Sequence, residues 1–177
     1  SKISFLTPPT QQQQTQTQQT MLIESNQKTY PPHPDGLFEA AVVDVIDEGY
    51  RDKEFGGEKK RVREARLVFE TAEKRDDGKP FLLSAWATAS LHEKATLRKL
   101  IEPIIGRAIT AQEAKSFDLN SIKGKPCQVL VEHKLDTKGN TKAAIAKTLK
   151  TKAPYTASGT YVRKAKGEQN PDWNVNQ

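Results

Sequence analysis

The chain has 177 residues, a formal net charge of +6 and a pI of about 9.3, and only 35% of its residues are hydrophobic. No apolar stretch is long enough to cross a bilayer, and the single cysteine, Cys127, excludes an intramolecular disulfide. We therefore expect one hydrophobic core in a soluble protein of the cytoplasm, with no membrane partner.

The positive charge is concentrated in the C-terminal half of the chain. Between Ser121 and Lys166 there are eleven Lys or Arg residues and only two acidic ones. This balance favours a polyanionic partner, of which nucleic acid is the foremost example. The alternative is a lysine-rich, solvated surface that binds nothing.

The N-terminal segment lacks the composition of a folded region. Residues 11–20 are glutamine and threonine only, and neither a packed core nor an amphipathic helix can be built from them. We expect residues 1–34 to be a disordered tail.

Three strands are predicted in the next part of the chain. Leu37–Ile46 is rich in Val, Ala and Phe and predicts the first strand. Gly49–Gly57 predicts a hairpin loop before a second strand at Lys59–Glu70. The Asp-Gly turn within Arg75–Pro80 then leads to a third strand, Phe81–Thr88.

A helix follows the third strand. Ser90 with Glu93 matches the capping-box pattern, and apolar residues at helical spacing continue to Ile105, before Gly106. A second helical turn is predicted from Thr110, with Glu113 three residues later.

Two further strands are predicted at Cys127–His133 and Ala143–Leu149. The resulting fold class is mainly β with one α-helix, in the order β-β-β-α-β-β. This order is typical of the OB-fold, a partly open five-stranded barrel. We place this nucleic-acid-binding domain at residues 35–152 and a flexible basic and aromatic tail at residues 153–177.

Several strings within residues 35–148 resemble a family of small proteins encoded by phages and other mobile elements. The strings that carry the resemblance are Gly36–Ala40, Arg66–Phe69, Ala89–Lys94, Leu97–Lys99, Phe117–Leu119 and Gly124–Cys127. The family is regarded as OB-fold single-stranded-DNA-binding proteins. The resemblance implies largely sequence-independent binding of single-stranded DNA in replication or recombination, in a bacterial host's cytoplasm, with replication or recombination proteins as further partners.

Trp86 is the leading candidate for stacking on DNA bases. Alternation in the third strand directs Ala85 and Ala87 toward the core and Trp86 outward. Trp86 has no adjacent cation, which departs from the aromatic and basic pair expected on this strand. The alternative is that Trp86 covers the open end of the barrel or packs beneath the helix, since tryptophan is usually well buried.

Cations of the second strand, aromatics of the first loop and residues of the C-terminal tail complete the candidate interface. Acidic residues alternate with the strand cations and could pair with them instead, a bulge would change the face that each cation occupies, and the loop could pack on itself. The tail residues would clamp nucleic acid and order on binding. The candidates are Lys59, Lys60, Arg61, Arg63, Arg66, Tyr50, Phe55, Lys150, Lys152, Tyr155, Tyr161, Arg163 and Lys164.

No pattern of an enzyme, cofactor or metal site is found in the sequence. The only Cys and the three His residues match no zinc motif, and no phosphate-binding loop or Gly-x-Ser-x-Gly element is present. We therefore expect a non-enzymatic protein with no cofactor. The rival function is an OB-fold adaptor or an inhibitor of a host enzyme that binds no nucleic acid. A homo-oligomer formed by strand pairing is also compatible with the sequence.

Overall fold

The computed structural model describes residues 31–163 and 174–175. The chain divides into two units, Ser1–Pro31 and Pro32–Gln177, and every element described below belongs to the second unit. The predicted N-terminal tail thus lies almost wholly outside the described residues.

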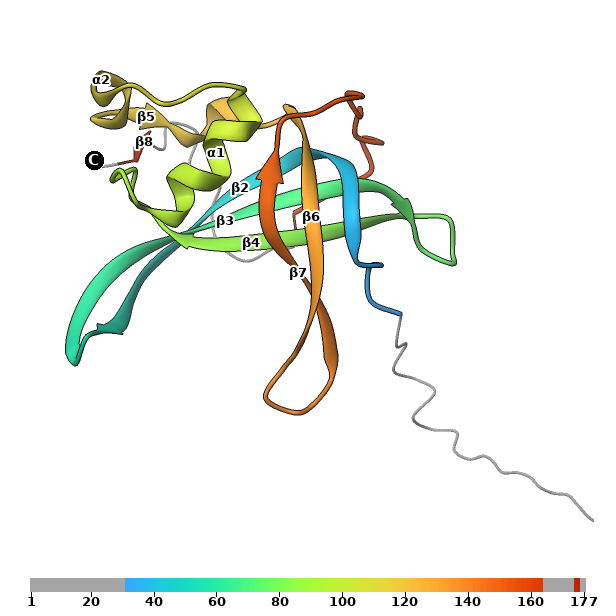
Figure 1. The fold of residues 1–177 in the computed structure, drawn as a ribbon, viewed down its shortest axis with the longest axis horizontal. Helices are drawn as coiled ribbons and strands as arrows, with labels where there is room; N and C mark the ends of the chain where they lie inside the picture. Colours follow the sequence, from blue (N-terminus) through green and yellow to red (C-terminus); the bar gives the residue numbers. More distant parts are fainter. Residues whose placement is uncertain (1–30, 164–173, 176–177) are drawn as a thin grey trace, which may run out of the picture. The chain divides into compact units, whose positions relative to one another are not determined.

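The second unit is built on one antiparallel sheet of five strands, so the mainly β class is confirmed. The spatial order is β4-β3-β2-β6-β7, and the outermost strands β4 and β7 contact each other without a hydrogen-bonded ladder (Figure 1). The sheet is therefore curled but not closed. The strands are β2 (Gly36–Phe55), β3 (Glu58–Lys74), β4 (Pro80–Thr88), β6 (Pro126–Leu135) and β7 (Thr141–Leu149).

The longest helix of the described residues, α1 (Thr96–Ile105), packs beside β4, β6 and β7. It begins later than predicted: Ala95 is its N-cap and makes no side-chain cap, while Ser90 accepts a hydrogen bond from the His92 amide instead. The predicted end is correct, because Gly106 adopts φ +80°, which favours glycine.

Shorter elements connect α1 to β6. The helical turn predicted from Thr110 is confirmed as α2 (Ala111–Ala114), and Thr110 and Glu113 form a capping box at its start. A 3-10 turn, η4 (Leu119–Ile122), follows, and β5 (Phe117–Asp118) pairs with β8 (Asn174–Val175).

The main core lies between one face of the sheet and α1. Alternate residues in the middle of β3 and toward the end of β4 contribute to it, including Leu67, Phe69 and Ala85, and α1 contributes Leu97 and Ile101. We call the opposite side of β2, β3 and β4 the outer face. Side chains on the outer face point away from the main core, and those that nothing covers are available for binding.

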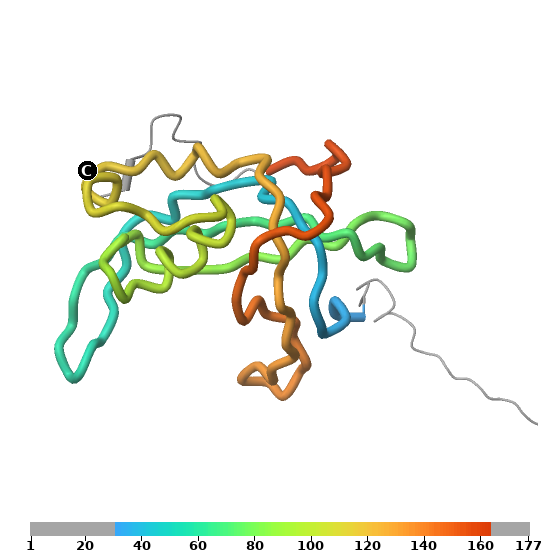
Figure 2. Tube along the Cα trace, turned by 45° about the horizontal axis from the view of Figure 1, so that its top comes forward, coloured from blue at the N-terminus to red at the C-terminus, as the bar shows by residue number. Residues whose placement is uncertain are grey.

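The predicted loop at Gly49–Gly57 is wrong, because β2 continues to Phe55 and β3 starts at Glu58. Only Gly56 and Gly57 form the turn, with φ of +56° and +88°, which suits a two-residue hairpin of type I′. The resulting two-stranded arm, residues 49–64, projects from the sheet, as does the β6–β7 hairpin (Figures 1 and 2).

Part of the predicted C-terminal tail crosses the outer face. Residues 151–163, here called the strap, have no regular secondary structure and bind carboxylates of β2 and β3. The first part of the segment that we predicted to be flexible is therefore attached to the sheet through specific side chains. Within the described ranges, no helix is long and apolar enough to cross a membrane.

Candidate nucleic-acid interface

Trp86 lies on the outer face of β4 and is 47% exposed. Its neighbours Ala85 and Ala87 are buried in the core, as the alternation of the sequence predicts. The alternative of a buried Trp86 is therefore wrong. About half of the Trp86 residue surface is open to solvent, near the end of β4, where the backbone is fixed by pairing to β3.

Two guanidinium groups flank the Trp86 ring. The Cζ atom of Arg66, the direct cross-strand partner of Trp86, is 5.3 Å from the ring centroid. The Cζ atom of Arg51, from the arm, is 4.9 Å away. Both distances are within the range of cation–π attraction. The positive charge that is missing beside Trp86 in the sequence is thus supplied from β2 and β3.

The two arginines differ in how firmly they are held. Arg66 donates from Nε to Glu48 at 2.6 Å and lies 3.4 Å from the Ser84 hydroxyl through Nη1. Glu48 stands at a register shift of β2, between Asp47 and Gly49. Arg51 has no ion pair within residues 31–163, so its charge is available to a phosphate.

The register of β3 decides which cations share a face with Trp86. Residues of β3 from Glu58 to Thr71 pair with β2 without an inserted residue on the β3 side, so even-numbered residues point to the outer face. Lys60 therefore lies on the same face as Arg66. Lys59, Arg61 and Arg63 point to the opposite face.

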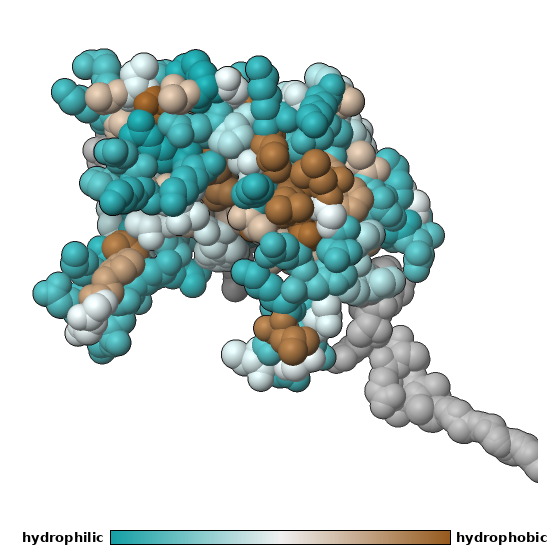
Figure 3. All heavy atoms as spheres, viewed as in Figure 1, coloured by the Kyte–Doolittle hydropathy of each residue, from teal (hydrophilic) through white to brown (hydrophobic). Residues whose placement is uncertain are grey.

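Residues of the outer face near Trp86 form what we call the Trp86 surface. Lys53 pairs with the buried Glu64 at 2.8 Å, whereas Lys60 is exposed and without an ion pair in the described chain. Hydrophobic atoms also lie near the tips of both projecting hairpins (Figure 3). The Trp86 surface comprises Arg51, Lys53, Phe55, Lys60, Arg66 and Trp86.

The opposite face of the arm carries the other predicted residues. Tyr50 is 58% exposed, and the Cζ atom of Arg61 is 5.8 Å from its ring centroid. Arg63 makes an ion pair with Asp47 at 2.5 Å. Burial alone would raise the pKa of Asp47, but the hydrogen bonds from Arg63 and Gly49 hold it below the usual value. Arg63 is thus committed to structure, whereas Tyr50 and Arg61 remain accessible.

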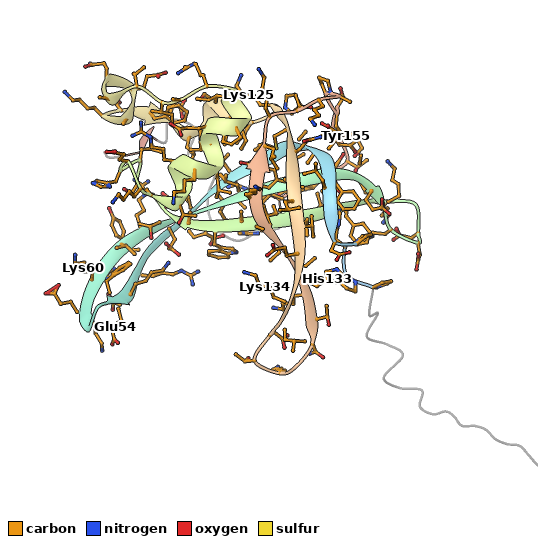
Figure 4. The ribbon with its side chains drawn as sticks, viewed as in Figure 1. Glu54, Lys60, Lys125, His133, Lys134 and Tyr155 are labelled. Carbon is orange, nitrogen blue, oxygen red and sulfur yellow. The ribbon has the colours of Figure 1, made fainter. Side chains whose placement is uncertain are left out.

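The described tail residues that contact the sheet bind beside the Trp86 surface and are not part of it. The hydroxyl groups of Tyr155 and Tyr161 donate to Glu70 and Asp44, and Arg163 also binds Asp44. Tyr155 lies at the end of the sheet remote from Glu54 and Lys60 of the arm (Figure 4). Lys150 and Lys152 are exposed, and Lys164 is outside the described residues.

Three functional residues were not singled out as contacts by the sequence reasoning. Arg51 falls in the segment that the sequence assigns to a loop, and a loop assignment does not predict that its side chain points toward Trp86. Asp44 and Glu70 stand in apolar runs and are 4% and 0% exposed. An acid within such a run requires a buried partner, and this signal could have identified both positions.

Other chemistry in the described residues is limited. No group of three or more His, Cys, Asp or Glu side chains gathers there in a way that would hold a metal ion. Cys127 is fully buried, and burial raises the pKa of its thiol to about 12. A thiol in this state is a packing residue and a poor nucleophile.

Comparison with known proteins identifies no relative of this chain: no family model matches the sequence, and the search of curated proteins found no match. The geometry of the Trp86 surface and the strap is therefore the basis for assigning a function.

Proposed function

We propose that this protein binds single-stranded DNA at the Trp86 surface, largely without regard to sequence. The observation that carries the proposal is a half-exposed tryptophan, fixed on a strand, with guanidinium groups 4.9 Å and 5.3 Å from its ring centroid. Stacking of a base on such a ring contributes about 1 to 3 kcal/mol and tolerates any base, because each base has a π-face.

The arm supplies the charge that a DNA backbone requires. Arg51 and Lys60 are cations without ion pairs in the described residues, and both lie on the face that carries Trp86. A DNA phosphate that contacts either side chain would release the cations condensed on the DNA. Added salt opposes this release, so the affinity for DNA should fall as the salt concentration increases. Phe55, 46% exposed next to the turn, offers a second aromatic ring for a base.

The fold that we propose for this function is a partly open OB barrel. The strand order β4-β3-β2-β6-β7, the contact between β4 and β7 and the position of α1 between the third and fourth long strands support this assignment. In that fold the second and third strands and the adjoining hairpins form the ligand-binding face. Here those strands are β3 and β4, which carry Arg66 and Trp86.

A duplex is the less suitable ligand for this surface. A two-stranded β-ribbon such as the arm can enter a major groove. However, Trp86 lies at the base of the arm, on the sheet, and its ring can be used for stacking only by a base that has left its own stack. The proposal therefore includes a preference for single strands.

Fluorescence anisotropy of a labelled oligo-dT, titrated with the full chain, tests the proposal. We expect binding that is stronger than to a duplex of equal length and that weakens steeply between about 50 and 200 mM salt. Binding of neither ligand at low salt would overturn the proposal and leave the adaptor or inhibitor as the leading function. Equal affinity for both ligands would reject the preference for single strands.

A further inference from the structure

The strap is attached to the outer face at three carboxylates. Glu39 accepts hydrogen bonds from the Thr151 hydroxyl at 2.5 Å and from the amides of Lys152 and Ala153 at 3.2 Å and 3.3 Å. Burial alone would raise the pKa of Glu39, but the hydrogen bonds from Thr151 and other donors lower it. Glu39 is therefore an ionised acceptor at neutral pH.

Glu70 and Asp44 form the other two attachment points. The hydroxyl groups of Tyr155 and Ser158 donate to Glu70 at 2.7 Å and 2.9 Å, and the Ser158 amide donates at 2.6 Å. Asp44 accepts from the Tyr161 hydroxyl at 2.8 Å and from Nε of Arg163 at 2.8 Å. Each carboxylate thus receives several donors from a single short segment.

The strap is held in the manner of a bound peptide. Within the described residues, no backbone–backbone hydrogen bond joins residues 151–163 to the sheet, and no strap residue belongs to the main core cluster. Its attachment consists of side-chain and backbone donors that point at carboxylates of β2 and β3, and Nη2 of Arg163 also donates to the Val45 carbonyl oxygen at 3.0 Å. Recognition of this kind depends on the side chains of the segment and on its free backbone amides.

The surface beneath the strap has its own apolar floor. Ala41 pairs with Glu70, and Val68 pairs with Asp44, so both residues lie between the carboxylates on the outer face. They are 1% and 3% exposed, yet neither belongs to the main core cluster. The outer face therefore combines apolar contact with fixed acceptors, as peptide-binding surfaces do.

We propose that this part of the outer face is a peptide-binding site, which the chain's own residues 151–163 fill. Its ligand class is an extended segment that presents Tyr and Ser hydroxyl groups, free backbone amides and one Arg guanidinium, with the spacing of the strap. The site adjoins the Trp86 surface without sharing a residue with it. A second molecule of the same segment competes with the strap for it.

Competition sets the expected behaviour of the intact chain. A covalently linked segment has an effective concentration on the order of millimolar. A free peptide at lower concentration should therefore bind the wild-type chain poorly. It should bind well once the donors of the strap are removed, because the carboxylates and the apolar floor are then available.

The test uses a fluorescein-labelled peptide of residues 150–163 and full-length variants. The donor-removed variant carries Tyr155→Phe, Ser158→Ala, Tyr161→Phe and Arg163→Gln. We expect it to bind the peptide at least about tenfold more tightly than the wild type. Adding Glu70→Gln and Asp44→Asn should remove this gain. No binding by a folded donor-removed variant, or equal binding after the carboxylates are replaced, would overturn the proposal.

Amide hydrogen exchange of the wild-type chain gives an independent test, which holds even where the variants do not fold. A docked peptide opens without global unfolding. The Ser158 amide, which donates to Glu70, should therefore exchange at least roughly 100-fold faster than the Leu67 amide in the core of β3. Exchange of both amides only by global unfolding would show that the strap is an inseparable part of the fold. Neither experiment involves nucleic acid, so its outcome is independent of the proposed function.

Discussion

Arg66 and Trp86 are direct partners across the β3–β4 ladder, and the Arg66 guanidinium lies 5.3 Å from the centre of the indole ring. Both side chains lie on the outer face, and neither belongs to the main core cluster. A cross-strand pair of a cation and an aromatic ring presents a flat surface and a charge at a fixed spacing, which is the combination that single-stranded nucleic acid uses.

Replacement of Trp86 should weaken DNA binding more than it affects the fold. Trp86→Ala removes one stacking platform, and we expect a loss of about 1 to 3 kcal/mol in binding to oligo-dT, or roughly 5- to 150-fold in Kd. Anisotropy titrations at fixed salt measure this loss. The matched control is Leu82→Ala, because Leu82 is 46% exposed and also lies on the outer face of β4. An equal loss in both variants would argue against a stacking role for Trp86.

Arg51 should contribute mainly to the salt dependence of binding. It has no ion pair within the described residues, so a contact with a phosphate costs no existing bridge. The slope of log Kobs against log salt is negative for a nucleic-acid binder, and we expect Arg51→Gln to reduce its magnitude by about 1. The comparison is Arg63→Gln, since Arg63 is paired with Asp47 on the opposite face of the arm. An unchanged slope in Arg51→Gln would place the phosphates elsewhere.

The sheet was predictable because its strands carry a local signal. In β4 the alternation of Leu83, Ala85 and Ala87 with outward residues identifies both the strand and the exposure of Trp86. The β3 half of the arm was predicted as part of the second strand, whereas the β2 half from Gly49 to Phe55 was assigned to a loop, since its residues are largely charged and bury little. The pairing of the arm extends to Phe55 and Glu58 because Gly56 and Gly57 adopt positive φ in the turn between them. A Gly-Gly pair is equally compatible with a loop.

The strap could not be predicted from local patterns. Its donors pair with carboxylates that are far away in sequence, as Tyr161 and Asp44 are separated by 117 residues. The spacing of these donors follows the positions of Glu70 and Asp44 on the folded sheet and matches no helical or strand period. The same aromatic and basic residues were therefore interpreted as a nucleic-acid clamp.

The ion pair between Arg163 and Asp44 should stabilise the folded chain. Burial alone would raise the pKa of Asp44, but the hydrogen bonds from Arg163 and Tyr161 outweigh it and hold the pKa below the usual value. We expect Arg163→Ala to lower the free energy of unfolding by about 1 to 3 kcal/mol, since it removes hydrogen bonds to a charged group. Urea denaturation monitored by circular dichroism measures the change.

The control for this prediction is an exposed pair. The Arg107 side chain is 55% exposed and binds Glu113 at 2.7 Å. Solvent screens such a pair, so Arg107→Ala should shift the midpoint of unfolding much less. Similar shifts in the two variants would show that the Asp44 contact contributes no more than a surface bridge.

His33 should make stability depend on pH in the range where the carboxylates do not titrate. The ring is 1% exposed, binds the Thr71 hydroxyl at 2.7 Å and lies against Phe38 and Phe81. Burial lowers its pKa, although a hydrogen bond to Pro34 acts in the opposite direction. The unfolded chain therefore takes up a proton at His33 before the folded chain does.

The sign of this effect follows from the linkage between protonation and folding. The contribution of a neutral His33 is fully present above its unfolded pKa of about 6.5 and is lost as pH falls below that value, by at most about 1.4 kcal/mol per pH unit. Urea denaturation between pH 7.5 and pH 5 should show this decline in the wild type. His33→Gln keeps a hydrogen-bonding group but does not titrate, so its stability should change less over the same range. An identical decline in both proteins would assign the pH dependence to other groups.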